Sequence, residues 1–110
     1  MSMYVLNEAG EPVPAADGLA WARWFETNPD RTVAADDIDV NGARYRVSTV
    51  FLGVDHGYGD GDGDPILWET LVFSDDMSID STMQRYVSRS EAVIGHAGTV
   101  AALERGEVPE

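Results

Sequence analysis

The dipeptide Asn41-Gly42 is the feature of this sequence that most constrains its fold. Both residues tolerate the positive φ of a type I′ turn, and they separate two strand-like runs, 32–40 and 44–52. A third strand-like run, 65–73, carries apolar residues on both of its faces, so we expect both faces to be covered there. The sequence therefore predicts an antiparallel sheet that contains this hairpin.

A helix is predicted ahead of the hairpin. Asp17 can cap it, its body covers 19–26, and Asn28-Pro29 ends it because the residue before proline is driven out of helical geometry. A short strand at 3–6 and a turn precede it. The spacing of its aromatic residues predicts one core-facing side, formed by Trp21, Trp24 and Phe25.

A second helix is predicted near the end of the chain, after a short extended segment, 83–87. Ser88 and Glu91 form a capping box that opens it, and Gly106 follows its last turn. Its predicted apolar face comprises Val93, Ala97, Val100 and Leu103, with His96 on the same stripe. We therefore expect an α+β fold in which two helices pack on an antiparallel sheet of three to four strands. We also expect residues 1–110 to form one domain, with an N-terminal strand and turn at 1–16 and a frayed tail at 106–110.

Charge and composition restrict the possible partners. The net charge of −13 comes from 20 carboxylates against seven cations, all of them arginine, so the surface repels phosphate backbones and direct nucleic-acid binding is disfavoured. There is no cysteine, no apolar run of roughly 18 residues and no signal peptide, so we expect a cytoplasmic protein without membrane association. The acidity has two interpretations. One is solubility and genome composition. The other is a decoy for DNA, built on the eight carboxylates that lie without a cation between Arg46 and Arg85.

The loop that contains Asp60, Asp62 and Asp64 resembles the start of a calcium-binding EF-hand loop. The match fails because Pro65 stands where glycine is required and Leu71 where a bidentate glutamate is required. We therefore predict a flexible connection between paired strands and no designed metal site.

The two histidines raise the question of a catalytic or metal site. Asp55-His56 ends a strand, and if the second helix crosses the sheet, His56, His96 and Glu69 could converge as a two-histidine, one-carboxylate set. The alternative is that His96 is a core residue, hydrogen-bonded to the backbone or to a carboxylate. No nucleophile elbow, phosphate-binding glycine loop or HExxH pattern is present, so no catalytic residue, cofactor or metal is predicted.

Binding of a small anionic ligand agrees better with the sequence. A few arginines in one pocket decide recognition locally, since guanidinium groups bind phosphate in bidentate fashion and stack on bases. The candidates are Arg23, Arg31, and Arg85 beside Tyr86, while Trp24, Phe25 and Trp68 could supply stacking faces. Each also has a plain structural interpretation, as a solvated arginine or a core aromatic residue.

Five segments resemble a widespread group of small phage and prophage proteins. They are WARWFE, DRTVA, STVFLGVDH, PILWETLVF and QRYVSRSEAVIGH, in that order. The group has a WxxWFE-like helix, strands reading STVFLGLDH and PLLFETMVF, and a helix start RYxTxxEAxxGH. The likeness spans residues 21–100. It departs from the group at Val54, Trp68 and Leu71, and the loop 57–64 is particular to this chain.

The resemblance implies an anti-defence role in an infected bacterial cell. Some phage proteins of this scale sequester cyclic nucleotide immune signals, and on that basis we predict non-enzymatic binding of a nucleotide-like signal. We also expect a homo-oligomer, with the pocket at a subunit interface. The alternative is an acidic inhibitor or DNA mimic that binds a host defence protein. The residues predicted to bind the ligand are Trp24, Phe25, Thr49, Asp55, His56, Trp68, Glu69, Thr70, Arg85, Tyr86, Ser88 and His96.

Overall fold

The structure is a computed structural model that describes residues 2–55, 65–74 and 80–107. In chain order the elements are β1 (Tyr4–Leu6), β2 (Pro12–Pro14), α1 (Gly18–Thr27), β3 (Thr32–Val40), β4 (Ala43–Phe51), β5 (Trp68–Ser74), β6 (Asp80–Tyr86) and α2 (Arg89–Glu104). Strands β3 to β6 form a four-stranded antiparallel sheet in sequential order, and β1 pairs with β2 in a separate hairpin. The predicted α+β class with an antiparallel sheet is confirmed.

The central hairpin forms at the predicted turn. Val40 pairs with Ala43, and the two residues between them have positive φ, 50° at Asn41 and 83° at Gly42. Next to the turn, Arg44 forms an ion pair with Asp39 at 3.0 Å, and this hydrogen bond lowers the pKa of the Asp39 carboxyl below its ordinary value. The turn chemistry thus fixes the register of β3 on β4.

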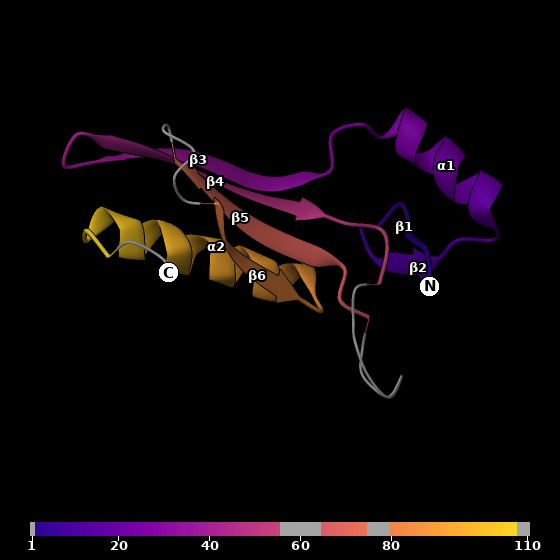
Figure 1. The fold of residues 1–110 in the computed structure, drawn as a ribbon. Coiled ribbons are helices and arrows are strands. Elements are labelled where there is room, and N and C mark those ends of the chain that lie inside the picture. The colour runs from indigo at the N-terminus through magenta and orange to yellow at the C-terminus, as the bar shows by residue number, and fades with distance from the viewer. Residues whose placement is uncertain (1, 56–64, 75–79, 108–110) are drawn as a thin grey trace.

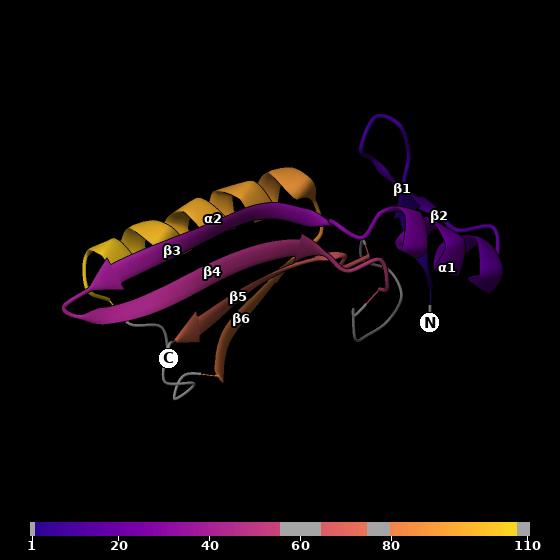
Figure 2. The same cartoon turned by 90° about the horizontal axis from the view of Figure 1, so that it is seen from above.

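The two helices meet the sheet differently. Helix α2 runs along one face of the sheet and contacts β3, β4, β5 and β6, whereas α1 lies beyond the sheet's end, beside the hairpin of β1 and β2 (Figures 1 and 2). The link from α1 to the sheet is aromatic, with the Trp24 ring edge-on to Phe51 at 5.8 Å between centroids. The molecule is accordingly elongated, 48 × 32 × 25 Å.

Both helices begin at their predicted caps. The Asp17 side chain accepts a hydrogen bond from the Ala20 N–H at 2.8 Å, and the Ser88 hydroxyl accepts one from the Glu91 N–H at 3.1 Å. The Glu91 carboxylate in turn accepts from the Val87 N–H. Side-chain caps therefore place both helix starts.

The core lies between α2 and the sheet. Its buried residues form one cluster near the central hairpin and another near the start of α2; the first is Ile38, Tyr45, Val47, Val72 and Leu103, and the second is Phe51, Leu67, Trp68 and Ala92.

The predicted apolar face of α2 was wrong in part. Helix α2 buries Ala92, His96 and Leu103, while Val93 is 43% exposed and Ala97 is also exposed. The helix is rotated by about one position relative to the prediction, so that the small Ala92 and not Val93 packs against the second cluster. A helix that is apolar around most of its circumference gives little indication of which side faces the core.

Candidate functional site

A chain of polar side chains crosses the buried interface between α2 and the sheet. The Thr49 hydroxyl lies 2.5 Å from that of Thr70 and 2.7 Å from Nδ1 of His96, and Nε2 of His96 lies 2.7 Å from a carboxylate oxygen of Asp36. At the other end the Tyr86 hydroxyl donates to Thr70 at 3.1 Å. The chain therefore links all four strands of the sheet to the helix.

The proton positions in this chain follow from its two ends. A carboxylate accepts hydrogen bonds, so Nε2 of His96 donates to Asp36, and in the neutral imidazole Nδ1 then accepts from Thr49. Thr49 accepts in turn from Thr70, and Thr70 from Tyr86. Each threonine hydroxyl donates once in the same direction. The single proton of the Tyr86 hydroxyl has two acceptors within reach, Thr70 at 3.1 Å and Oε1 of Gln84 at 3.0 Å, so the chain contains no unpaired donor.

The group Asp36, His96 and Thr49 has the composition of a nucleophilic triad, but its surroundings suit a structural role. Thr49 is 0% exposed, and its hydroxyl oxygen is already held by Thr70 and His96. A substrate carbonyl has no path to this oxygen in the structure, although attack requires contact at about 3 Å. The arrangement therefore stabilises the docking of α2, as the core interpretation of His96 predicted.

Gly95 leaves room for the Tyr86 end of this chain. A Cβ atom at residue 95 would come closer than 3.0 Å to the Tyr86 ring, whereas one at Gly98 would meet nothing within 4 Å. We expect Gly95→Ala to lower the free energy of unfolding by about 2 kcal/mol, since the displaced ring outweighs the gain of roughly 1 kcal/mol in helix propensity. Gly98→Ala, the matched control within one chain, should be neutral or stabilising in urea titrations of dilute, monomeric protein. Equal effects of the two substitutions would contradict the contact with Tyr86.

Glu69 and His96 do not converge. Glu69 forms an ion pair with Arg85 at 2.9 Å, and it precedes Thr70, whose hydroxyl faces α2. Neighbouring residues of a strand point to opposite faces of the sheet, so Glu69 and Arg85 lie on the face away from the helix. His56 lies outside the described residues, and no group of three metal-ligating side chains occurs among the residues described. The predicted convergence of Glu69 with His96 was therefore wrong.

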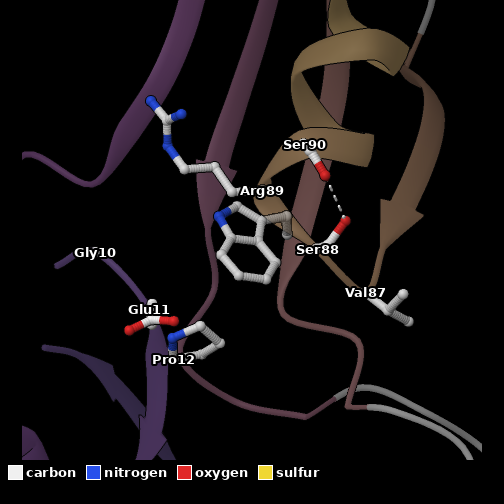
Figure 3. A pocket seen from close by; sticks show the side chains of 8 residues that line it. Gly10, Glu11, Pro12, Val87, Ser88, Arg89 and Ser90 are labelled. Atoms are coloured by element: carbon white, nitrogen blue, oxygen red, sulfur yellow. Dashed lines mark hydrogen bonds between the residues drawn. The ribbon is translucent and has the colours of Figure 1, made fainter.

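A pocket of about 280 Å³ lies where the start of α2 meets the β1–β2 hairpin. Figure 3 shows Ser88, Arg89 and Ser90 on one side of it and Glu11 and Pro12 on another. The backbone N–H groups of Arg89 and Ser90 lie in the first turn of a 16-residue helix, where they have no intrahelical acceptor. A helix start of this kind favours negative charge.

Trp68 forms part of the wall of this pocket. Its side chain is 1% exposed, yet no described residue accepts a hydrogen bond from its indole N–H. Every fully buried side-chain nitrogen or oxygen in the described part of the chain has a partner. The unpaired N–H therefore keeps some accessible surface, on a side chain that lines the pocket, and it is available to a hydrogen-bond acceptor.

Arg89 brings an uncommitted positive charge to the pocket. Four of the other arginines form ion pairs, and Arg31 is held by backbone carbonyls and lies over the Phe25 ring. Within the described ranges only Arg23 and Arg89 have no carboxylate, carbonyl or aromatic partner. Glu11 is the one carboxylate lining the pocket among these residues, and its Oε1 accepts from Asn7 at 3.5 Å.

The other predicted ligand residues are scattered. Trp24 and Phe25 belong to the aromatic cluster that joins α1 to the end of β4. The Asp55 carboxylate accepts from the Ile66 N–H at 3.0 Å and so holds the two ends of the intervening loop together. Of the predicted set, Trp68 and Ser88 line the pocket, and Thr49, Thr70, Tyr86 and His96 share the buried chain.

Sequence reasoning missed Arg89 and Asp36. Arg89 directly follows the predicted cap Ser88, and helix N-termini are common anion-binding sites. Its position in the sequence was therefore a signal for anion binding. Asp36 follows two alanines in β3, and nothing in the local pattern shows that it faces a histidine 60 residues away.

Comparison with protein-family models, curated proteins and solved structures found no significant match to this chain. Neither helix of the described residues combines the length and the apolar character needed to cross a bilayer. The assignment of function therefore depends on the pocket, and the resemblance to phage proteins stays a prediction.

Proposed function

We propose that this protein binds a small anionic, nucleotide-like ligand in the pocket between the start of α2 and the β1–β2 hairpin. The observation that carries the proposal is the unpaired indole N–H of Trp68, on a side chain that is 1% exposed and lines this pocket. This N–H keeps only slight exposure and has no acceptor among the described residues, so an oxygen of a bound ligand would supply the hydrogen bond that it lacks.

Three further groups favour an anion at the same place. Arg89 and the start of α2, with its first-turn N–H groups and the positive end of the helix dipole, all border this pocket. Phosphate and carboxylate groups both suit such donors, and arginine adds bidentate geometry. The anion is thus selected locally although the whole chain carries a net charge of −13.

Glu11 and the size of the pocket narrow the ligand further. A carboxylate in the wall accepts hydrogen bonds, so it favours a ligand that carries a hydroxyl or amino group beside its anion. The volume of about 280 Å³ lies just below the range of roughly 300–1,000 Å³ typical of ligand sites. A single phosphate-bearing unit of a nucleotide therefore suits the pocket better than a whole dinucleotide.

Titration of the purified chain tests the proposal. Inorganic phosphate, nucleoside monophosphates, cyclic mononucleotides and cyclic dinucleotides are added in turn, and binding is followed by calorimetry and thermal shift. We expect saturable binding by at least one nucleotide, recovered chemically unchanged after incubation. Absence of binding by every probe at millimolar concentration would exclude the proposed function.

Substitutions at the pocket should weaken that binding in a graded way. Arg89→Gln removes a charge-assisted hydrogen bond and should raise Kd at least roughly tenfold, and Trp68→Phe removes only a neutral donor and should raise it roughly fivefold. Arg23→Gln is the matched control, since Arg23 is equally unpaired in the described structure but belongs to α1. Unchanged affinity in Arg89→Gln would place the ligand elsewhere.

The DNA-mimic alternative remains a prediction. Of the eight carboxylates between Arg46 and Arg85 on which it depends, Glu69 is paired with Arg85 and Asp55 holds the Ile66 N–H. The side chains of the other six, namely Asp60, Asp62, Asp64, Asp75, Asp76 and Asp80, lie outside the described part of the structure.

A further inference from the structure

The outer face of α2 is apolar and uncovered. Helix α2 contacts the strands of the sheet through its inner face, and no other described helix or strand lies on its outer face (Figure 2). Ile94 is 71% exposed and Val93 is 43% exposed, and Ala97 and Gly98 are exposed beside them. No aspartate, glutamate, lysine or arginine occurs between Glu91 and Glu104, in a chain in which charged residues make up 25%.

The exposed residues of α2 form a single stripe along the helix. Residues three and four apart share one face of a helix, and Ile94, Ala97, Gly98, Ala101 and Arg105 follow this spacing along the side opposite the buried Ala92, His96 and Leu103. The small residues Ala97 and Gly98 at the middle of the stripe allow another helix to approach closely. The larger Ile94 lies on the N-terminal side of them.

We propose that this face binds the same face of a second copy of the chain, with the two α2 helices antiparallel and a twofold axis at Gly98. The argument is charge complementarity. Glu91 and Arg105 lie at opposite ends of the stripe and on the same flank, seven residues before and seven residues after Gly98. An antiparallel twofold pairing about Gly98 brings Glu91 of each copy to Arg105 of the other.

Both groups have capacity for this second contact. Arg105 uses its Nε to bind Glu107 and its side chain is 63% exposed, so its terminal nitrogens are free to donate to another carboxylate. Glu91 uses Oε2 to accept from the Val87 N–H, which leaves Oε1. A parallel pairing would instead oppose Glu91 to Glu91 and Arg105 to Arg105, and the charges thus select the antiparallel arrangement.

The self-association is independent of the proposed ligand, because Arg89 and Trp68 lie on the pocket side of α2. Sedimentation equilibrium of the full chain between about 10 and 500 μM should give twice the monomer mass of 12.0 kDa. A monomer throughout this range, or a mass other than that of a dimer, overturns the proposal.

Two substitutions locate the interface. Ile94→Glu buries a carboxylate twice at the contact and should raise the dimer dissociation constant roughly a hundredfold, with an unchanged circular dichroism spectrum. Leu19→Glu is the matched control, since Leu19 is 61% exposed on α1, and it should leave the dimer intact. A dimer that survives Ile94→Glu, or that Leu19→Glu dissociates, overturns the assignment to α2.

A charge exchange tests the antiparallel register. Arg105→Glu opposes a carboxylate to Glu91 of the other copy and should weaken the dimer, and the double variant Glu91→Arg/Arg105→Glu should restore it, although it loses one half of the capping box. In the same cysteine-free chain, Gly98→Cys should cross-link with a short bis-maleimide, and Leu19→Cys should not. Failure of both the rescue and the cross-link overturns the twofold at Gly98.

Discussion

Replacing His96 with alanine should lower the free energy of unfolding by about 4 kcal/mol. The imidazole is 5% exposed, it holds Thr49 and Asp36 at 2.7 Å each, and its removal leaves a cavity between α2 and the sheet. Large-to-small substitutions of buried side chains cost about 2–5 kcal/mol, and loss of a buried hydrogen-bond partner costs about 1–3 kcal/mol. Urea unfolding followed by tryptophan fluorescence, at one fixed protein concentration, measures this loss.

Asp36→Ala is the matched control for His96. The Asp36 side chain is 54% exposed, so water can replace its carboxylate at Nε2 of the imidazole, and we expect a loss of about 1 kcal/mol. If the two substitutions had equal effects, the stabilisation would reside in the exposed end of the chain and not in the buried contact of His96 with Thr49.

Gly53→Ala should cost about 3 kcal/mol. Gly53 has a φ of 77°, which strains any residue with a Cβ by about 1–2 kcal/mol, and its Cβ would come closer than 3.0 Å to the Phe25 ring. Its carbonyl accepts hydrogen bonds from the Trp21 indole at 3.0 Å and from the Tyr4 N–H at 2.8 Å. The substitution therefore disturbs the point at which α1 and β1 dock on the end of the sheet.

Gly106→Ala separates the two causes of this loss. Gly106 has a φ of 83°, and a Cβ there would meet nothing within 4 Å, so this variant reports backbone strain alone and should lose about 1 kcal/mol. Thermal unfolding of both variants gives the difference. A Gly53→Ala loss no larger than that of Gly106→Ala would show that the Phe25 contact adapts without cost.

Gly53→Ala should also affect the proposed ligand site. Glu11 and Pro12 reach the pocket from the β1–β2 hairpin, whereas Ser88, Arg89 and Ser90 reach it from α2. Since β1 is held to the sheet partly through Gly53, loosening that junction should weaken ligand binding even below the unfolding temperature. The pocket thus depends on two segments that are far apart in the chain.

The sequence predicted local structure correctly where neighbouring residues determine it. The turn at Asn41-Gly42, the caps Asp17 and Ser88, and the end of α2 before Gly106 all follow from the conformational preferences of a few adjacent residues. The prediction of which side of α2 faces the core was wrong at Val93 and Ala97, because both are exposed. An apolar side chain does not by itself show whether it faces a sheet or a second copy of the same helix.

The sequence by itself determined the class of fold, the order of its main strands and helices, and the residue types available for binding an anion. Only the tertiary structure decided that His96 meets Thr49 and Asp36, that Glu69 turns to the opposite face, and that Trp68 and Arg89 share a pocket. The physical reason is range. Turns and caps arise from interactions within about four residues, whereas the contacts of His96 join α2 to strand residues 47 and 60 positions away in the chain, and the Glu69–Arg85 pair joins two strands across 16 residues.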